Sequence, residues 1–275
     1  MIRESEKIRA IDTIVTCAKK YDAELKNNNL LILSKIGKMI LPFSITFEES
    51  NFLHLTGMET NSMSAVDFLR ASVNRKLSLG DFSYKSKYFT RLKLEVLQMA
   101  MEVHKKATSI GEFEADSGFR LYSDIIAGTE KFGMGFVRSQ SDEKYYPNTV
   151  LGDDARSYML KERKFPIVAI LRKRVSEERY NEITYISKNI NRSKLYIDET
   201  ILDKLDSALR GIITDKSVAE PPLESPTKDA PTQKDASVSR IFGDNGKLAQ
   251  KCEEAMHNNA NRPPKPPKSK ENEIE

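Results

Sequence analysis

The sequence predicts an α+β domain over residues 1–214, with N-terminal helices packed on an antiparallel sheet of about four strands, and a disordered tail over residues 215–275. Apolar residues recur at helical spacing early in the chain, and period-two alternation replaces this pattern from Leu121 onward. Eight of the 11 prolines lie after residue 220, where large apolar residues are few. A stretch of this composition cannot bury enough surface to offset the entropy of ordering it.

The N-terminal part contains one hairpin between helical stretches. Residues 4–26 are expected to form a helix, because their apolar side chains fall near one stripe. Residues 30–34 and 39–47 are expected to form two strands around a turn at Gly37. Two further helices are expected at residues 64–74 and 91–108.

The helix expected at 91–108 has the clearest periodicity in the chain. Its predicted buried stripe consists of Leu92, Val96, Met99 and Val103. The charged residues of the same helix are then expected to face solvent, and these are Lys93, Glu95 and Lys105.

The second part of the chain predicts the sheet. Residues 167–171 are apolar at every position, which is typical of a central strand covered on both faces. One or two helical turns are expected at 153–160, and a closing helix at 197–212. The other strands are expected at residues 121–126, 133–138, 145–149 and 183–188.

Charge and cysteine content limit the class of protein. The formal net charge is +4, and ten basic residues stand against four acidic ones between Lys161 and Lys194. Such a stretch is either a nucleic-acid-binding surface or an ordinary solvated face. Two cysteines, a charged N-terminus and the lack of an 18-residue apolar run predict a cytoplasmic protein with no membrane association.

Several kinds of site are not expected. The chain has three histidines and contains no Cys-x-x-Cys or His-Glu-x-x-His motif, so no metal site is predicted. It also lacks a phosphate-binding P-loop, and Gly133 and Gly135 lie within a strand pattern instead of a dinucleotide fingerprint. No cofactor is therefore expected.

His54 is the histidine best placed for proton transfer. Residues 50–57 are expected to be extended and to end in a turn, so that His54 and Thr56 point to one side. His54 is then either a general acid or base near neutral pH, or a hydrogen-bonded structural residue. His104 is expected on the exposed flank of its helix, and it and His257 are expected to be inert.

The last expected strand is rich in polar side chains. Glu182, Thr184 and Lys188 share one face of this strand, and Ser187 lies on the other. These residues are either part of a site or the outward face of an edge strand. Metal-independent cleavage of RNA needs a base, an acid and groups that stabilise a pentavalent transition state. The composition permits that chemistry but does not select it.

Short blocks of the sequence, in order, resemble the fourth group of phage barnase–EndoU–colicin–RelE-like nucleases, over roughly residues 10–190. The blocks are Ser50–Gly57 (SNFLHLTG), Ala65–Phe68, Arg75–Ser78, Asp81–Phe82 with Leu121–Asp124, Gly133–Val137, Tyr146–Thr149, Ile167–Lys173 and Glu182–Lys188.

This resemblance implies a barnase–RelE-like fold to which the 30–47 hairpin is an addition, and a metal-independent ribonuclease of a phage or other mobile element. It implies RNA, such as tRNA or mRNA, as the partner, and allows for an immunity or antitoxin protein. Glu182 is one candidate for a second acid–base group. The expected catalytic residues are His54, Thr56, Thr184 and Ser187, and the expected nucleic-acid-binding residues are Arg172, Lys173, Lys188, Arg75 and Lys76.

Two other functions remain open from the sequence. The same fold could serve as a non-catalytic accessory factor that binds RNA or protein. An ADP-ribose transferase is a third hypothesis, because His54 and Thr56 followed by a tyrosine-rich sheet could hold a nicotinamide cofactor. Truncation after Thr214 is expected to leave folding intact, because the tail lacks a periodic apolar pattern.

Overall fold

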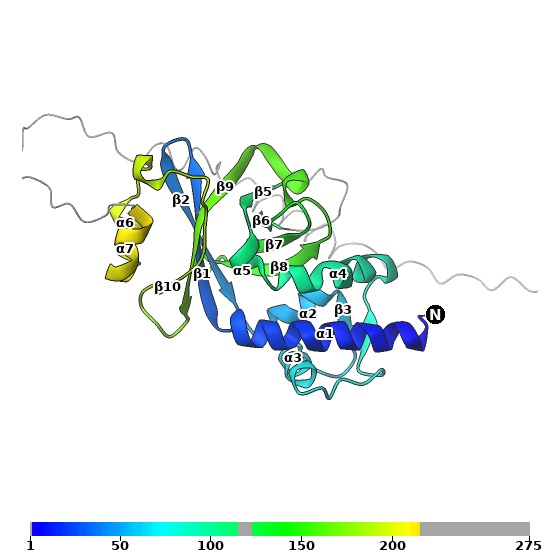
Figure 1. The fold of residues 1–275 in the computed structure, drawn as a ribbon. Coiled ribbons are helices and arrows are strands. Elements are labelled where there is room, and N and C mark those ends of the chain that lie inside the picture. Colours follow the sequence, from blue (N-terminus) through cyan, green and yellow to red (C-terminus); the bar gives the residue numbers. More distant parts are fainter. Residues whose placement is uncertain (1, 115–122, 215–275) are drawn as a thin grey trace, which may run out of the picture. The chain divides into compact units, whose positions relative to one another are not determined.

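The computed structural model describes residues 2–114 and 123–214 and has the expected α+β character (Figure 1). The tail expected at residues 215–275 and the start of the strand expected at 121–126 lie outside the described residues.

Within the described residues, seven strands close into a mixed β-barrel in the order β1-β2-β8-β7-β6-β5-β9, and β9 pairs back with β1. All neighbours are antiparallel except β2 and β8, which meet in parallel where Ile45 lies opposite Tyr145. The strands are β1 (Asn28–Ile36), β2 (Met39–Phe47), β5 (Ser109–Phe113), β6 (Ile125–Gly128), β7 (Gly133–Arg138), β8 (Tyr145–Leu151) and β9 (Met159–Arg174).

The barrel corrects the expectation of a simple antiparallel sheet of about four strands, which was wrong. The strand expected at 167–171 is only the apolar centre of β9, which is 16 residues long. Its first half pairs with β5, and its second half pairs with β1. One long strand therefore joins the N-terminal hairpin to the later strands, and the hairpin is part of the barrel wall instead of an addition. An eighth strand, β10 (Glu182–Ile186), pairs with the second half of β9.

The helices lie outside the barrel. Figure 1 shows α1 (Glu4–Glu24) alongside α2 (Asn51–Thr56), α3 (Ala65–Val73) and α4 (Lys87–Ala100). Two helices replace the single one expected at 91–108. The first, α4, begins after the cap residue Ser86, and the second is α5 (Val103–Lys106). The closing helix expected at 197–212 is also divided into two helices, α6 (Glu199–Leu202) and α7 (Ser207–Thr214). The remaining elements are the short turns η1 (Ala155–Tyr158) and η2 (Arg192–Lys194), and the small hairpin of β3 (Met58–Thr60) and β4 (Phe82–Tyr84).

An aromatic cluster fixes α2 between α1, α3 and the barrel. The ring of Tyr21 lies 5.2 Å from that of Phe52 and 6.1 Å from that of Phe47, and Phe52 lies 6.3 Å from Phe68. All four rings are buried, and each buried phenylalanine contributes about 2–3 kcal/mol. Because a six-residue helix is unstable alone, this packing is what allows α2 to form.

A second apolar layer covers the outer side of β1 and β9. Residues 167–171 are all buried, as expected for a strand that is covered on both faces. The side chains that form this layer include Leu31, Leu33, Val168, Leu171, Ile201, Leu205, Leu209 and Ile213.

Candidate functional site

Helix α2 presents His54 to solvent. Phe52 and Leu55 are buried on the inner side of this helix, while His54 lies on the exposed side between them. The helix ends at Gly57, whose φ of +72° is the left-handed conformation that favours glycine. The expectation that residues 50–57 are extended was therefore wrong, because the three-residue spacing of Phe52 and Leu55 turns both toward the core as a helix.

The C-terminal end of α2 is held by side chains from the neighbouring helix α4. Lys93 Nζ donates a hydrogen bond of 3.0 Å to the backbone oxygen of His54. Thr90 Oγ1 donates to the backbone oxygen of Gly57 at 2.7 Å, and the backbone N–H of Lys85 donates to the same oxygen at 3.2 Å. These contacts satisfy carbonyl groups that have no partner within the helix itself.

The electrostatic surroundings keep the His54 imidazole in its neutral form at physiological pH, which is the form that can act as a base. Partial burial lowers the pKa of His54 below its usual 6.5, and the positive charges of Lys85 and Lys93 lower it further. Burial together with the nearby charge of Lys85 also lowers the pKa of Lys93, to about 8. A neutral imidazole thus lies beside an ammonium group that can lose its proton near physiological pH, which is a feature of acid–base sites.

Lys93 and Lys85 were not among the residues expected at the site. The predicted stripe placed Lys93 on the outer face of its helix, but the buried residues of α4 are Thr90, Val96, Leu97 and Ala100. Leu97 follows Lys93 by four positions, so both lie on the inward side and Lys93 is half-buried. The spacing of Thr90, Lys93, Leu97 and Ala100 was the signal that could have identified it.

Thr56 lies close to His54 in sequence, but its hydroxyl is already engaged. The side chain is buried, and Oγ1 donates to the backbone oxygen of Leu53 at 2.7 Å. The same atom accepts a hydrogen bond of 3.1 Å from the backbone N–H of Met58. The expectation that Thr56 points to the same side as His54 was wrong, because residues two positions apart share one face of a strand but lie on nearly opposite sides of a helix.

The two hydroxyl-bearing residues expected on the last strand are also held by contacts to the backbone of neighbouring elements. Thr184 Oγ1 donates to the backbone oxygen of His104 at 2.6 Å and to that of Ile170 at 3.1 Å. Ser187 is buried, and its backbone N–H donates to Val168 at 2.8 Å. These contacts attach β10 to β9 and α5, and the structure shows no contact between them and His54.

Arg172 and Glu182 are paired with each other on adjacent strands. The guanidinium of Arg172 donates to both carboxylate oxygens of Glu182, at 2.8 and 2.9 Å, and to the backbone oxygen of Glu24 at 2.9 Å. Glu182, considered above as a second acid–base group, is therefore held in an ion pair on β10 and is not placed beside His54.

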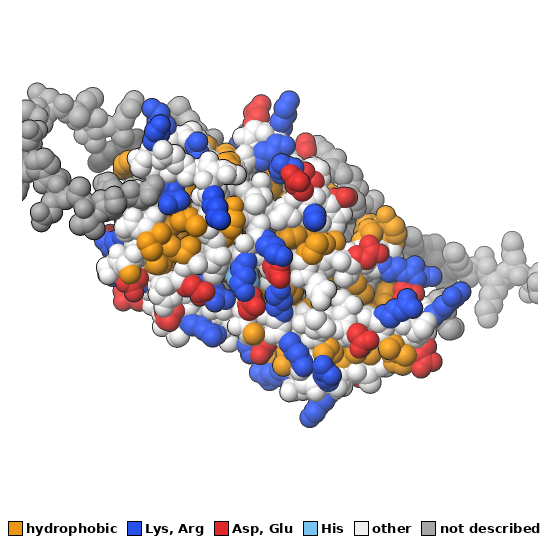
Figure 2. Space-filling view, viewed as in Figure 1, with side chains coloured by type: hydrophobic (Ala, Val, Ile, Leu, Met, Phe, Trp, Pro, Cys, Tyr) orange, Lys and Arg blue, Asp and Glu red, His pale blue; other side chains and the backbone are white. Residues whose placement is uncertain are grey.

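The other expected nucleic-acid-binding residues are spread over separate surfaces. Lys173 Nζ donates to the backbone oxygens of Glu177 and Glu178, at 2.7 and 2.9 Å. Lys188 is exposed after β10, while Arg75 and Lys76 are exposed in the loop after α3. On the face drawn in Figure 2, basic and acidic side chains are interspersed, so this face has no continuous basic surface.

His104 differs from the sequence expectation, which placed it on an exposed flank. It is fully buried, and Nε2 lies 3.1 Å from a carboxylate oxygen of Glu24. Burial lowers the pKa of His104 to about 4, although Glu24 opposes this effect. An imidazole enclosed in this way cannot reach a substrate, and its role is in the packing of α5.

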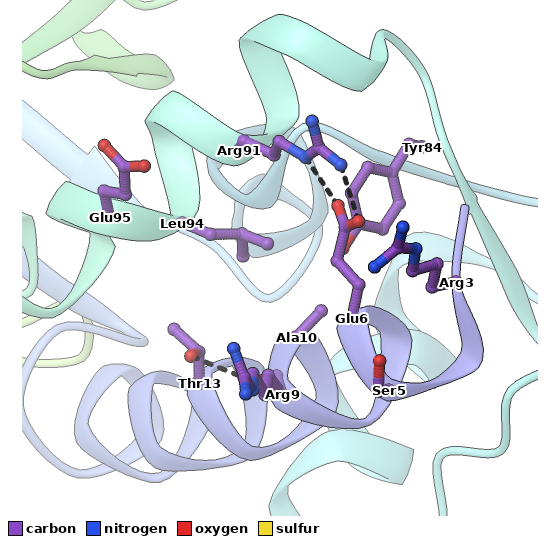
Figure 3. A pocket seen from close by; sticks show the side chains of 10 residues that line it. All are labelled: Arg3, Ser5, Glu6, Arg9, Ala10, Thr13, Tyr84, Arg91, Leu94 and Glu95. Carbon is purple, nitrogen blue, oxygen red and sulfur yellow. Dashed lines mark hydrogen bonds and ion pairs between the residues drawn. The ribbon is translucent and has the colours of Figure 1, made fainter. Parts of the chain in front are cut away.

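A groove of about 610 Å³ lies between α1 and α4 (Figure 3). At one end Arg91 donates to both carboxylate oxygens of Glu6, each at 2.6 Å. Tyr84, the last residue of β4, lines the groove and immediately precedes Lys85, whose charge acts on His54. The lining residues are Arg3, Ser5, Glu6, Arg9, Ala10, Thr13, Tyr84, Arg91, Leu94 and Glu95.

Within residues 2–114 and 123–214, no three His, Cys, Asp or Glu side chains gather closely enough to hold a metal ion. No helix in the same residues is both long enough and apolar enough to cross a membrane.

Comparison with known protein families identifies a match over most of the described residues. Residues 13–189 match the family described as phage-Barnase-EndoU-ColicinE5/D-RelE like nuclease 4. This match includes α2, the β3–β4 hairpin and α4, and therefore all residues around His54. No curated protein and no solved structure matches the chain.

Proposed function

Because this chain belongs to the phage-Barnase-EndoU-ColicinE5/D-RelE like nuclease 4 family, we propose that it is a metal-independent ribonuclease of a phage or other mobile element, with His54 as its general base. The nuclease class follows from the family. The observation that supports the rest is the exposed imidazole of His54 near the end of α2, where the positive charges of Lys85 and Lys93 act on it and Lys93 binds its backbone oxygen.

The proposed reaction uses the ribose of the substrate as the nucleophile. Neutral His54 removes the proton of a 2′-hydroxyl, and the resulting oxygen attacks the adjacent phosphorus. The bond between phosphorus and the 5′-oxygen breaks, which leaves a 2′,3′-cyclic phosphate and a 5′-hydroxyl. The positive charge of Lys85 stabilises the additional negative charge of the pentavalent transition state.

This mechanism requires RNA, because DNA has no 2′-hydroxyl for His54 to deprotonate. Cytoplasmic RNA such as tRNA or mRNA is the proposed substrate class. A cell that carries a nuclease of this type has to restrain it, and an immunity or antitoxin protein is the proposed means.

The test is cleavage of total RNA by the purified full-length protein in EDTA, followed by sequencing of the fragment ends. The wild type should produce 5′-hydroxyl and cyclic phosphate ends. The His54→Ala variant should be slower by about 10²–10⁴, which is the usual contribution of one general acid or base. A single 2′-deoxy substitution at the cleavage position should block the reaction of the wild type.

Circular dichroism and thermal melting establish whether the variant is folded. A folded His54→Ala variant that cleaves RNA at the wild-type rate would remove His54 from the mechanism. A wild type with no activity on any RNA would instead favour the accessory-factor function.

A further inference from the structure

We propose that Lys93 is the general acid of this site and donates the proton that the departing 5′-oxygen requires. This assignment rests on the proposed ribonuclease function and identifies the second proton-transfer group of the same site.

The position of Lys93 is fixed by the end of α2. Its aliphatic chain passes over Gly57, where a Cβ would lie 3.0 Å from Lys93 Cδ. One N–H of its ammonium group binds the backbone oxygen of His54 at 3.0 Å. An ammonium group has three N–H donors, so two remain for a substrate that is bound beside His54.

The surroundings of Lys93 also favour loss of a proton. The side chain is half-buried, and Lys85 contributes a neighbouring positive charge that disfavours a second one. The resulting pKa of about 8 leaves Lys93 mostly protonated at pH 7, yet able to release a proton in the transition state. An ordinary lysine, with a pKa of about 10.4, would be a much poorer donor.

Two carboxylates that could otherwise supply a proton are engaged elsewhere. Glu182 is paired with Arg172, and Glu59 on β3 accepts a hydrogen bond of 2.9 Å from Ser83. The exposed imidazole and the lowered lysine pKa occur together at the end of α2, and this coincidence points to a two-group mechanism.

The proton balance of the reaction is complete with these two groups. His54 gains the proton of the 2′-hydroxyl as the new bond between the 2′-oxygen and phosphorus forms. The bond to the 5′-oxygen then breaks, and Lys93 gives its proton to that oxygen. Exchange with water returns both groups to their starting states.

The decisive experiment compares two RNA substrates that differ in the departing atom. One has the normal 5′-oxygen, and the other has sulfur at the same position. A thiolate needs no proton in order to leave, because the pKa of a thiol is about 8.5. On the normal substrate, Lys93→Met and Lys93→Arg should each be slower by about 10²–10⁴, since an arginine stays protonated. On the sulfur substrate, both variants should cleave within a few-fold of the wild type.

His54→Ala serves as the matched control, because loss of the base should slow cleavage of both substrates. The alkaline limb of the wild-type pH–rate profile, expected near pH 8, should disappear in Lys93→Arg. Equal losses on both substrates for Lys93→Met would show that Lys93 only positions α2, and a fully active Lys93→Arg would equally overturn the assignment. An inactive wild type would overturn the ribonuclease proposal itself.

Discussion

Lys93 crosses the end of helix α2 directly over Gly57, so that a Cβ at residue 57 would lie only 3.0 Å from Lys93 Cδ. Thr90 approaches from the same helix, with Oγ1 at 3.1 Å and Cα at 3.3 Å from that Cβ position. Gly57 therefore allows both the left-handed end of α2 and the close approach of α4.

This relationship predicts a specific loss of activity in Gly57→Ala. Alanine at a φ of +72° should lower the free energy of unfolding by about 1 kcal/mol or more. The added methyl group should also displace Lys93 and reduce the rate of RNA cleavage. Denaturant unfolding and cleavage rates measure the two effects separately.

Gly37→Ala is the matched control for this prediction. Gly37 has a φ of +57°, but a Cβ there would meet no atom within 4 Å. Its replacement should lower stability by a similar amount and leave the cleavage rate unchanged. Equal activity of the two variants would show that the approach of Lys93 to Gly57 has no role in cleavage.

The elements of the barrel were largely predictable, but its closure was not. Local periodicity identifies the 30–47 hairpin, the apolar centre of β9 and the strands near 133–138 and 145–149. The closure depends on pairing between Leu31 of β1 and Leu171 of β9, which are far apart in the chain. Neither a propensity nor a period contains that information, so the sequence led to a smaller open sheet.

The site could be predicted only in part, because some of its contacts also join residues that are far apart in the chain. His54 is the histidine that the sequence analysis selected, and the structure places it on an exposed surface. Lys93 was missed because the buried face predicted for its helix differs from the observed buried face by a rotation of about one residue position. The backbone partners of Thr184 belong to α5 and β9, and the sequence of β10 alone does not reveal them.

The acidic limb of the cleavage reaction should report the pKa of His54. A general base is active when it is deprotonated, so the rate should rise with pH through a midpoint below 6.5. Lys85→Gln removes a positive charge that lowers this pKa, and the midpoint should therefore move upward. Lys19→Gln, an exposed change on α1, should leave the midpoint in place. An unchanged midpoint in Lys85→Gln would show that Lys85 does not influence the base.

Arg172 is expected to act on stability more than on RNA binding. Replacement by Met would leave Glu182 without its ion-pair partner and would remove the donor at 2.9 Å from the backbone oxygen of Glu24, which would keep only the 3.1 Å hydrogen bond from Asn28 Nδ2. The free energy of unfolding should fall by about 1–3 kcal/mol, whereas the exposed Lys188→Met should change it by less than about 0.5 kcal/mol. Urea denaturation of the two variants tests this difference, and equal stabilities would contradict it.

If Lys188 contacts phosphate groups, its replacement should weaken RNA binding about equally for all sequences. The dependence of affinity on salt should also become less steep, because fewer counterions are released. These measurements use the His54→Ala variant, so that the RNA remains intact. An unchanged affinity and salt dependence would exclude Lys188 from the RNA-binding surface.

His104 should make the stability of the fold depend on pH. Its folded-state pKa of about 4 lies below the value of about 6.5 expected in the unfolded chain. Protonation then favours the unfolded state, so its contribution to stability is complete above pH 6.5 and is lost as the pH falls toward 4. Glu24 faces the ring and opposes this effect, while the positive charges of Lys105 and Arg172 add to it.

The window between pH 6.5 and 5 separates this contribution from those of the carboxylates, which titrate mainly below it. The pKa of His54 is also lowered, so it contributes a smaller loss of the same sign. Replacing buried His104 with Leu should remove most of the decline in unfolding free energy across this window, and His54→Gln should remove less. Urea unfolding at several pH values gives the slopes. A His104→Leu variant with the wild-type slope would show that the pKa of this buried imidazole is not lowered in the folded protein.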